Sequence, residues 1–138
     1  MNCRVCGSLT VSIVDFGYMP IANNFCKDIN KDTYRFNLAA EYCADCFLLQ
    51  LREQPIASLM FHDNYTFFTG LSSFMTMHFR EMLMSNIPND YPKNYMVSEI
   101  GCNDGTLLST VAKLGIKHVG IDPSRNVVEL ARLKGVTA

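Results

Sequence analysis

The sequence has almost no net charge and no long apolar run. Twelve Lys and Arg residues stand against 13 Asp and Glu residues, leaving a formal charge of −1, so no broad cationic surface for nucleic acid is expected. No stretch approaches the roughly 18 uninterrupted apolar residues of a membrane span, and the N-terminus lacks the apolar core of a signal peptide. The sequence favours a cytoplasmic protein that binds neither nucleic acid nor a membrane.

Three segments with different patterns follow one another along the 138 residues. Residues 1–52 contain paired cysteines and short β-rich runs, residues 53–93 contain apolar stretches typical of helices, and residues 94–138 alternate strand with helix. We therefore expect a small β domain, a helical connector packed between two domains, and the opening of a parallel sheet. The expected fold class is α/β, without internal repeats.

Local patterns predict the elements of the first two segments. Residues 10–16 and 47–51 are rich in strand-forming residues, and residues 17–20 indicate a turn. Residues 55–61 and 73–87 are predicted to be helical, and the apolar residues of the second stretch fall on more than one helical face. We expect these helices to be buried.

The last segment is predicted as strand, helix, strand, helix over residues 96–100, 106–114, 118–121 and 126–134. Each helix has a candidate N-cap before it and a glycine after it, namely Asp104 and Gly115 for the first helix and Ser124 and Gly135 for the second. These candidate caps and glycines agree with the short strand–helix connections of a parallel α/β sheet.

Four of the six cysteines form two CxxC pairs, Cys3 with Cys6 and Cys43 with Cys46. Each pair can present two thiolates from one tight turn, and together they supply a tetrahedral set of soft ligands for one zinc ion. The long separation between the pairs can be taken up by an intervening β-unit at little loop-closure cost. Residues 1–52 are therefore predicted to be a zinc-ribbon-like, zinc-binding domain.

A redox CxxC and four unrelated buried thiols are the alternatives to zinc. A closed four-cysteine shell leaves no open position for water or substrate, so the predicted zinc is structural. Cys26 and Cys102 fall outside the pattern, and neither has a basic partner nearby in sequence. We expect each to be a small buried residue.

A glycine-rich turn joins the predicted strand at residues 96–100 to the helix that follows. It has the pattern ExGxxxG, formed by Glu99, Gly101 and Gly105, and Asn103 stands where the dinucleotide fingerprint GxGxxG has its second glycine. NAD and FAD therefore become less favoured ligands. The end of such a strand is nevertheless where an α/β sheet places a nucleotide.

Asp122 follows the next strand and can accept hydrogen bonds from both hydroxyls of a ribose. Glu99 and Asp104 add negative charge near a cationic sulfonium and ammonium, and Gly101 permits close backbone approach. S-Adenosylmethionine (SAM) fits this chemistry. In the alternative interpretation, Glu99 and Asp104 are a strand-end residue and a helix cap in a sheet that binds nothing.

The two cysteine pairs resemble those of one known family when they are taken together with residues 17–25, 63–69, 99–108 and 120–123 and with His78. It is the family of zinc-containing class I methyltransferases that C-methylate nucleotide-linked keto-deoxysugars. The resemblance runs essentially the whole length of the chain. It implies an N-terminal zinc domain, a central Rossmann-like SAM-binding domain and a further C-terminal domain.

The same resemblance implies roles for residues in both predicted sites. Tyr65, Thr69 and His78 fall in the segment that approaches the sugar nucleotide and the cofactor in such proteins, although a Tyr or His between helices is more often a packing residue. By the resemblance, the SAM site would be lined by Glu99, Gly101, Asn103, Gly105 and Asp122. The charge of Asp104 adds this residue to the predicted cofactor site.

The sequence stops at Ala138, after the second predicted helix of the sheet. Carbon methylation needs a base that removes a proton beside the ketone and a group that stabilises the enolate, and no residue matches either role. We therefore name no catalytic residue and expect the N-terminal part of an enzyme, whose partner is a missing C-terminal half or another chain. A non-enzymatic zinc-containing interaction module and an inactive truncated methyltransferase are the alternatives.

Overall fold

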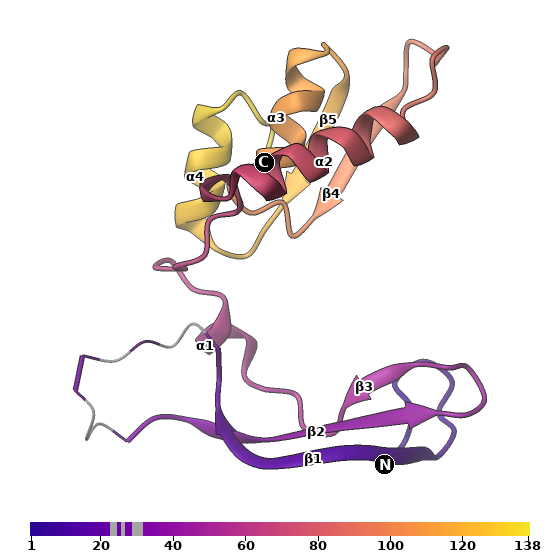
Figure 1. Cartoon of the computed structure of the whole chain (residues 1–138), viewed down its shortest axis with the longest axis vertical. Helices are drawn as coiled ribbons and strands as arrows, with labels where there is room; N and C mark the ends of the chain where they lie inside the picture. Colours follow the sequence, from indigo (N-terminus) through magenta and orange to yellow (C-terminus); the bar gives the residue numbers. More distant parts are fainter. Residues whose placement is uncertain (23–24, 26, 29–31) are drawn as a thin grey trace. The chain divides into compact units, whose positions relative to one another are not determined.

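The computed structural model describes residues 1–22, 25, 27–28 and 32–138 (Figure 1). These residues form two compact units, Met1–Met60 and Phe61–Ala138. Cys26 lies outside the described residues. No helix in the described part of the chain is both long enough and apolar enough to cross a membrane.

The first unit contains a three-stranded antiparallel sheet with strand order β1-β2-β3 (Figure 1). Its strands are β1 (Thr10–Pro20), β2 (Arg35–Cys43) and β3 (Leu49–Leu51), and a short helix, α1 (Ala57–Met60), follows. From Ala39 to Cys43 the central strand β2 buries alternate residues, as expected for a strand packed on one face. The predicted β character of this segment is confirmed.

The predicted turn at residues 17–20 is wrong, because β1 continues through it to Pro20. The pairing with β2 shifts between Asp15 and Tyr18. Gly17 has a φ of 75°, and its N–H donates to Asp15 Oδ1 at 2.8 Å. The glycine therefore forms an irregularity of the β-bulge kind inside a long strand and does not reverse the chain.

The second unit is a two-stranded parallel sheet with helices, in which β4 pairs with β5. Its elements, in chain order, are η1 (Thr69–Leu71), α2 (Ser73–Asn86), β4 (Met96–Ile100), α3 (Thr106–Lys113), β5 (Lys117–Ile121) and α4 (Arg125–Leu133). The strand–helix–strand–helix prediction is confirmed, with bounds that differ by one residue at most. The expected α/β class is likewise confirmed.

A small apolar core holds this second unit together. Leu108 and Val111 of α3 and Ala131 of α4 are fully buried in it. Leu83 is the one buried residue of α2, whose 14 residues are all described. The expectation that this helix is largely buried is therefore wrong, because only one edge of it meets the core.

The division into two units differs from the three expected segments. Helix α2, expected in a connector, packs beside α3 through Leu83. The unit boundary falls after Met60, so the second part of the predicted connector belongs with the parallel sheet. Phe79 and Ile87 also pack on this core, and a helix in a protein gains most of its stability from such packing.

The predicted C-terminal glycines are confirmed, because Gly115 (φ 70°) and Gly135 (φ 83°) take the left-handed conformation directly after α3 and α4. The predicted cap Asp104 is wrong. Gly105 occupies the N-cap of α3 with a φ of 69° and makes no side-chain cap. Ser124 is the N-cap of α4 by position, but its hydroxyl has no hydrogen-bond partner in the described part of the chain.

Candidate functional site

The four paired cysteines come together at one end of the first unit. Their sulfur atoms all lie within 4.8 Å of one another. Cys3 Sγ lies 3.5 Å from Cys46 Sγ, and Cys6 Sγ lies 3.5 Å from Cys43 Sγ. A tetrahedral zinc with Zn–S bonds of about 2.3 Å requires sulfur separations of about 3.8 Å. The cluster therefore has the size of a tetrahedral zinc site.

The two CxxC turns share one backbone conformation. The Gly7 N–H donates to Cys3 O at 3.0 Å, and the Phe47 N–H donates to Cys43 O at 2.9 Å. Gly7 and Phe47 occupy the same position in the two turns, and both have positive φ, 81° and 63°. Cys43 ends β2, so the sheet itself positions the second turn.

Gln50 on β3 connects the first CxxC turn to the sheet. Its Oε1 accepts from the Arg4 N–H at 3.0 Å, and its Nε2 donates to Asn2 O at 3.3 Å. The Gln50 side chain is buried, so both ends of the amide are satisfied. Sequence reasoning missed this residue, because nothing local marks a glutamine in a strand as the support of a distant turn.

Hydrogen bonding shifts the pKa values of the clustered cysteines in opposite directions. The Ser8 N–H and hydroxyl lower the pKa of Cys6 to about 6. The Leu48 N–H lowers the pKa of Cys46, but hydrogen bonds with the other three thiols and burial outweigh it and raise that pKa to about 12. The cluster thus favours a thiolate at Cys6 and a thiol at Cys46. Four thiolates together require a cation among them.

The glycine-rich turn after β4 has three residues with left-handed backbone angles, Gly101 (φ 76°), Asn103 (48°) and Gly105 (69°). The Gly101 N–H donates to Ile121 O at 2.7 Å, which ties the turn to the end of β5. A Cβ on Gly101 would meet no atom within 4 Å. The backbone at Gly101 is therefore open to a ligand.

Asp122 at the end of β5 already accepts two backbone hydrogen bonds. Its Oδ2 accepts from the Asn103 N–H at 3.0 Å, and its Oδ1 accepts from the Ser124 N–H at 2.8 Å. Each carboxylate oxygen retains a lone pair for a second donor. The carboxylate predicted to hold a ribose therefore also fixes the turn to β5.

Glu99, on β4, borders a pocket of about 350 Å³ beneath the C-terminal half of α2. Its Oε2 is buried and has no hydrogen-bond partner among the described residues. Burial, followed by the negative charges of Asp104 and Asp122, raises the pKa of Glu99 to about 7. Three carboxylates thus converge on one turn.

Asp104 is buried and fully engaged. Its Oδ1 accepts from the Thr106 hydroxyl at 2.6 Å, and its Oδ2 accepts from the Gly70 N–H at 3.0 Å and pairs with Lys134 Nζ at 2.9 Å. Burial alone would raise the pKa of Asp104, but the hydrogen bonds from Thr106 and Lys134 outweigh it and lower that pKa. Sequence reasoning missed Lys134, because the pairing joins α4 to a turn 30 residues earlier.

The segment that contains two predicted substrate residues is attached to this turn. Asn103 Oδ1 accepts from the Thr69 N–H at 3.0 Å, and Asn126 Nδ2 donates to Tyr65 O at 2.8 Å. His78 is exposed on α2, and no hydrogen bond among the described residues joins it to the turn. The structure therefore bonds the backbone of Thr69 to the turn and that of Tyr65 to α4, and it leaves His78 apart.

Cys102 is buried inside the turn, as expected for a small packing residue. Burial and then the charge of Asp122 raise its pKa to about 11, which keeps the thiol protonated. A Cβ on Gly120 of β5 would lie 2.7 Å from Cys102 Sγ. The cysteine therefore fills the space that this glycine leaves.

Comparison with known proteins bears on the cysteine cluster. Residues 3–61 match the family model Methyltransf_13, described as "Putative zinc binding domain". The matched range nearly coincides with the first compact unit. The first unit is therefore similar to this zinc-binding domain, and its four clustered cysteines support zinc as the cofactor.

The C-methyltransferase NovU of Streptomyces niveus is 29% identical to this chain over 140 residues. The alignment covers 98% of this chain and 33% of that protein. The chain thus spans about a third of the length of this curated relative and is similar to its N-terminal portion. The resemblance to C-methyltransferases predicted from the motifs is confirmed.

Proposed function

We propose that this chain is the N-terminal portion of a SAM-dependent methyltransferase that acts on carbon of a nucleotide-linked keto-deoxysugar. The first unit supplies a structural zinc site, and the second supplies the first strands and helices of a Rossmann-like SAM-binding sheet. The observation that carries the proposal is the convergence of Glu99, Asp104 and Asp122 on a glycine-rich turn that ends a parallel strand.

Cys3, Cys6, Cys43 and Cys46 would bind one zinc ion through four thiolates. A closed tetrahedral shell has no position for substrate, so this zinc contributes folding free energy to the first unit and takes no part in the reaction. The matching conformations of the two CxxC turns support a single shared ion.

The glycine-rich turn would hold SAM, which supplies the methyl group. Asp122 accepts hydrogen bonds from ribose hydroxyls with its remaining lone pairs, and Gly101 leaves its side of the turn open. Glu99 has an unpartnered oxygen and a raised pKa, so a nearby ammonium or hydroxyl donor would stabilise its carboxylate. A phosphate group here would face the carboxylates of Asp122 and Glu99, which disfavours NAD and FAD.

Tyr65, Thr69 and His78 are proposed as substrate-side residues. The backbone of Thr69 is bonded to Asn103 of the turn and that of Tyr65 to Asn126 of α4, which supports this position for the two residues. The proposal for His78 rests on the family resemblance alone. The base that removes a proton beside the ketone is not assigned to any residue of this chain.

Isothermal titration of S-adenosylhomocysteine into the zinc-loaded chain tests the cofactor site. We expect saturable binding at millimolar ligand, a loss of about tenfold in affinity for Asp122→Asn, and no heat with NAD. Asp90→Asn removes the same charge from an exposed loop and should bind like the wild type. Equal binding by Asp122→Asn, or no saturable heat with S-adenosylhomocysteine, would contradict the proposal.

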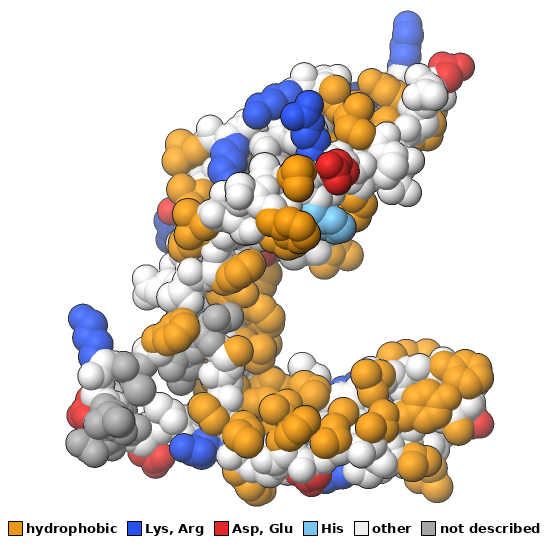
Figure 2. All heavy atoms as spheres, in the orientation of Figure 1, with side chains coloured by type: hydrophobic (Ala, Val, Ile, Leu, Met, Phe, Trp, Pro, Cys, Tyr) orange, Lys and Arg blue, Asp and Glu red, His pale blue; other side chains and the backbone are white. Residues whose placement is uncertain are grey.

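The bare face of the parallel sheet favours a second candidate, a zinc-containing interaction module. Met96, Ile100 and Ile121 are exposed there, and Ile100 is 88% exposed. Hydrophobic side chains also gather along the sheet of the first unit (Figure 2), where Val11 and Phe16 are exposed. Such surfaces are typical of interfaces. Size-exclusion chromatography with light scattering decides this, because a stable monomer argues against association through these faces.

A further inference from the structure

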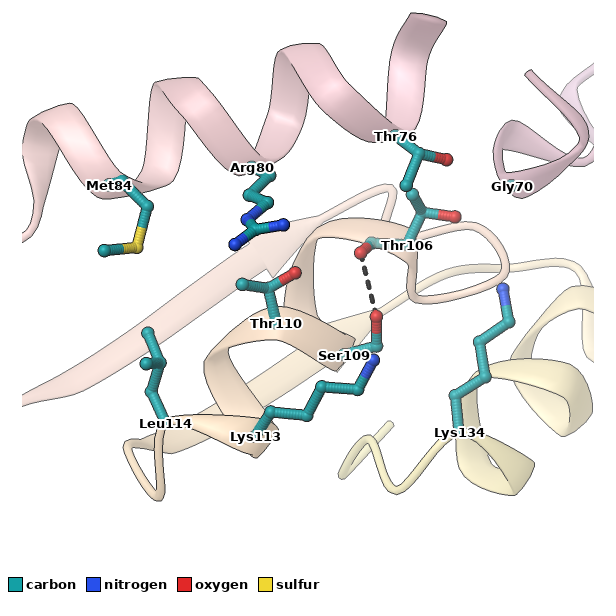
Figure 3. A pocket seen from close by; sticks show the side chains of 10 residues that line it. All are labelled: Gly70, Thr76, Arg80, Met84, Thr106, Ser109, Thr110, Lys113, Leu114 and Lys134. Carbon is teal, nitrogen blue, oxygen red and sulfur yellow. Dashed lines mark hydrogen bonds between the residues drawn. The ribbon is translucent and has the colours of Figure 1, made fainter. Parts of the chain in front are cut away.

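The second unit has a groove between α2 and α3 that the proposed methyltransferase site does not use. Its volume is about 720 Å³, within the range of small-molecule sites. Side chains from α2, α3 and the end of α4 converge on it (Figure 3). Lys and Arg side chains gather on the visible face of this unit (Figure 2).

Three cations line the groove, Arg80 from α2, Lys113 from α3 and Lys134 after α4. Lys134 is neutralised by Asp104, with 2.9 Å between Nζ and Oδ2. Arg80 and Lys113 have no ion pair with any residue among 1–22, 25, 27–28 and 32–138. None of the lining residues, all of which are described, is acidic. The groove therefore has two uncompensated positive charges.

Hydroxyl groups stand between these cations. Thr110 is half-buried and lies between Arg80 and Lys113 in Figure 3, and its hydroxyl has no partner among the described residues. The Ser109 hydroxyl already donates to Thr106 O at 3.0 Å, so Thr110 is the hydroxyl available to a ligand. An anion between Arg80 and Lys113 would thus gain a neutral donor as well as two charged ones.

The far end of the groove is apolar. Met84 and Leu114 lie together at one side of Figure 3, with the cations in the middle and toward the other side. The lining therefore changes from apolar to cationic along its length. This arrangement suits an elongated ligand whose charged part is at one end.

We propose that this groove binds a ligand with a diphosphate group. Two free cations match the two or more negative charges of a diphosphate, whereas one carboxylate would leave a cation unpaired. The diphosphate could be inorganic or part of a nucleotide, and Met84 and Leu114 would contact only the nucleotide. The proposal requires no methyltransferase activity, so the diphosphate site and the proposed methyltransferase function can each be disproved without the other.

The test is a calorimetric titration of the zinc-loaded chain with pyrophosphate, inorganic phosphate and ADP. The double variant Arg80→Gln and Lys113→Gln should weaken pyrophosphate binding by about tenfold or more. The control is Lys93→Gln with Lys117→Gln, which removes the same two charges from exposed positions outside the groove. Circular dichroism at 222 nm verifies that both double variants are folded.

Saturable pyrophosphate binding that the control leaves within about twofold supports the proposal. ADP binding more tightly than pyrophosphate identifies the nucleotide as the source, and equal binding identifies the inorganic ion. Equal losses in both double variants would mean attraction by net charge only and would overturn the proposal. Absence of saturable binding by pyrophosphate and ADP at millimolar concentration, or phosphate binding as tightly as pyrophosphate, would also overturn it.

Discussion

The carboxamide of Asn103 is bonded to the backbone of Thr69, with 3.0 Å between Oδ1 and the Thr69 nitrogen. Its Nδ2 donates to Phe67 O at 3.1 Å, so one side chain satisfies both a donor and an acceptor of the preceding segment. Asn103 does this from a left-handed conformation with a φ of 48°. Asparagine tolerates that conformation better than most residues, which explains its place in the turn.

Asn103→Ala should lower the free energy of unfolding by about 2 kcal/mol, because two hydrogen bonds are lost and alanine is strained at this φ. Asn103→Gly loses the same bonds without the steric strain and should be less destabilised. Urea unfolding followed at 222 nm, together with amide exchange at Thr69, measures both effects. Asn94→Ala, in an exposed loop, is the control. Unchanged exchange at Thr69 in Asn103→Ala would show that the contact is not formed.

The zinc site predicts about one zinc ion per chain, lost together with the fold of the first unit on chelation. Cys43→Ser should lower the zinc content strongly, because Cys43 is a buried member of the cluster. Cys102→Ala should leave it unchanged, since Cys102 lies in the other unit. Metal analysis by mass spectrometry checks the content. A chain that keeps the amide dispersion of the first unit without metal would refute the assignment.

Glu99 should make stability depend on pH. Its folded-state pKa of about 7 exceeds the ordinary value of 4.5, so the folded state binds more protons and stability falls as pH rises from about 4.5 to 7. Glu99→Gln removes this penalty and should stabilise the chain at pH 8 by about 1 kcal/mol after allowance for solvent screening, with no gain at pH 4.

Urea unfolding at pH 4 and pH 8, followed at 222 nm, checks this prediction. Glu129→Gln is the matched control, because Glu129 is exposed and only pairs with Arg125 on α4. A gain for Glu99→Gln that is equal at the two pH values would contradict the expected titration. The same variant should bind S-adenosylhomocysteine more weakly if Glu99 serves the cofactor.

Two glycines of the turn should differ in their tolerance of alanine. Both have positive φ, but a Cβ on Gly101 meets open space, whereas one on Gly105 would lie 2.8 Å from Ala131 Cβ and 2.9 Å from Val136 Cγ2. Gly101→Ala should cost about 1 kcal/mol and Gly105→Ala about 3 kcal/mol or more. Thermal unfolding measures the pair. Equal costs would mean that α4 does not pack on Gly105.

The sequence determined the features that depend on local chemistry. The spacing of Cys3, Cys6, Cys43 and Cys46 identified the cluster, because a CxxC turn brings two thiols together without help from the rest of the fold. The period of the apolar residues predicted β4, α3, β5 and α4 nearly to the residue. Gly115 and Gly135 marked the helix ends, because a helix commonly ends with a residue in the left-handed conformation, which glycine adopts without strain.

Only the tertiary structure decided which partners the polar residues take. Asp104 was predicted as a cap, but one of its oxygens binds the Thr106 hydroxyl and the other pairs with Lys134 and the Gly70 N–H, which the packing of α4 and of residues 65–71 brings to it. The apolar pattern of α2 likewise did not show that Leu83 would be its one buried residue. The contacts of Asp104 with Lys134 and Gly70 join residues 30 or more positions apart, where local propensity has no influence.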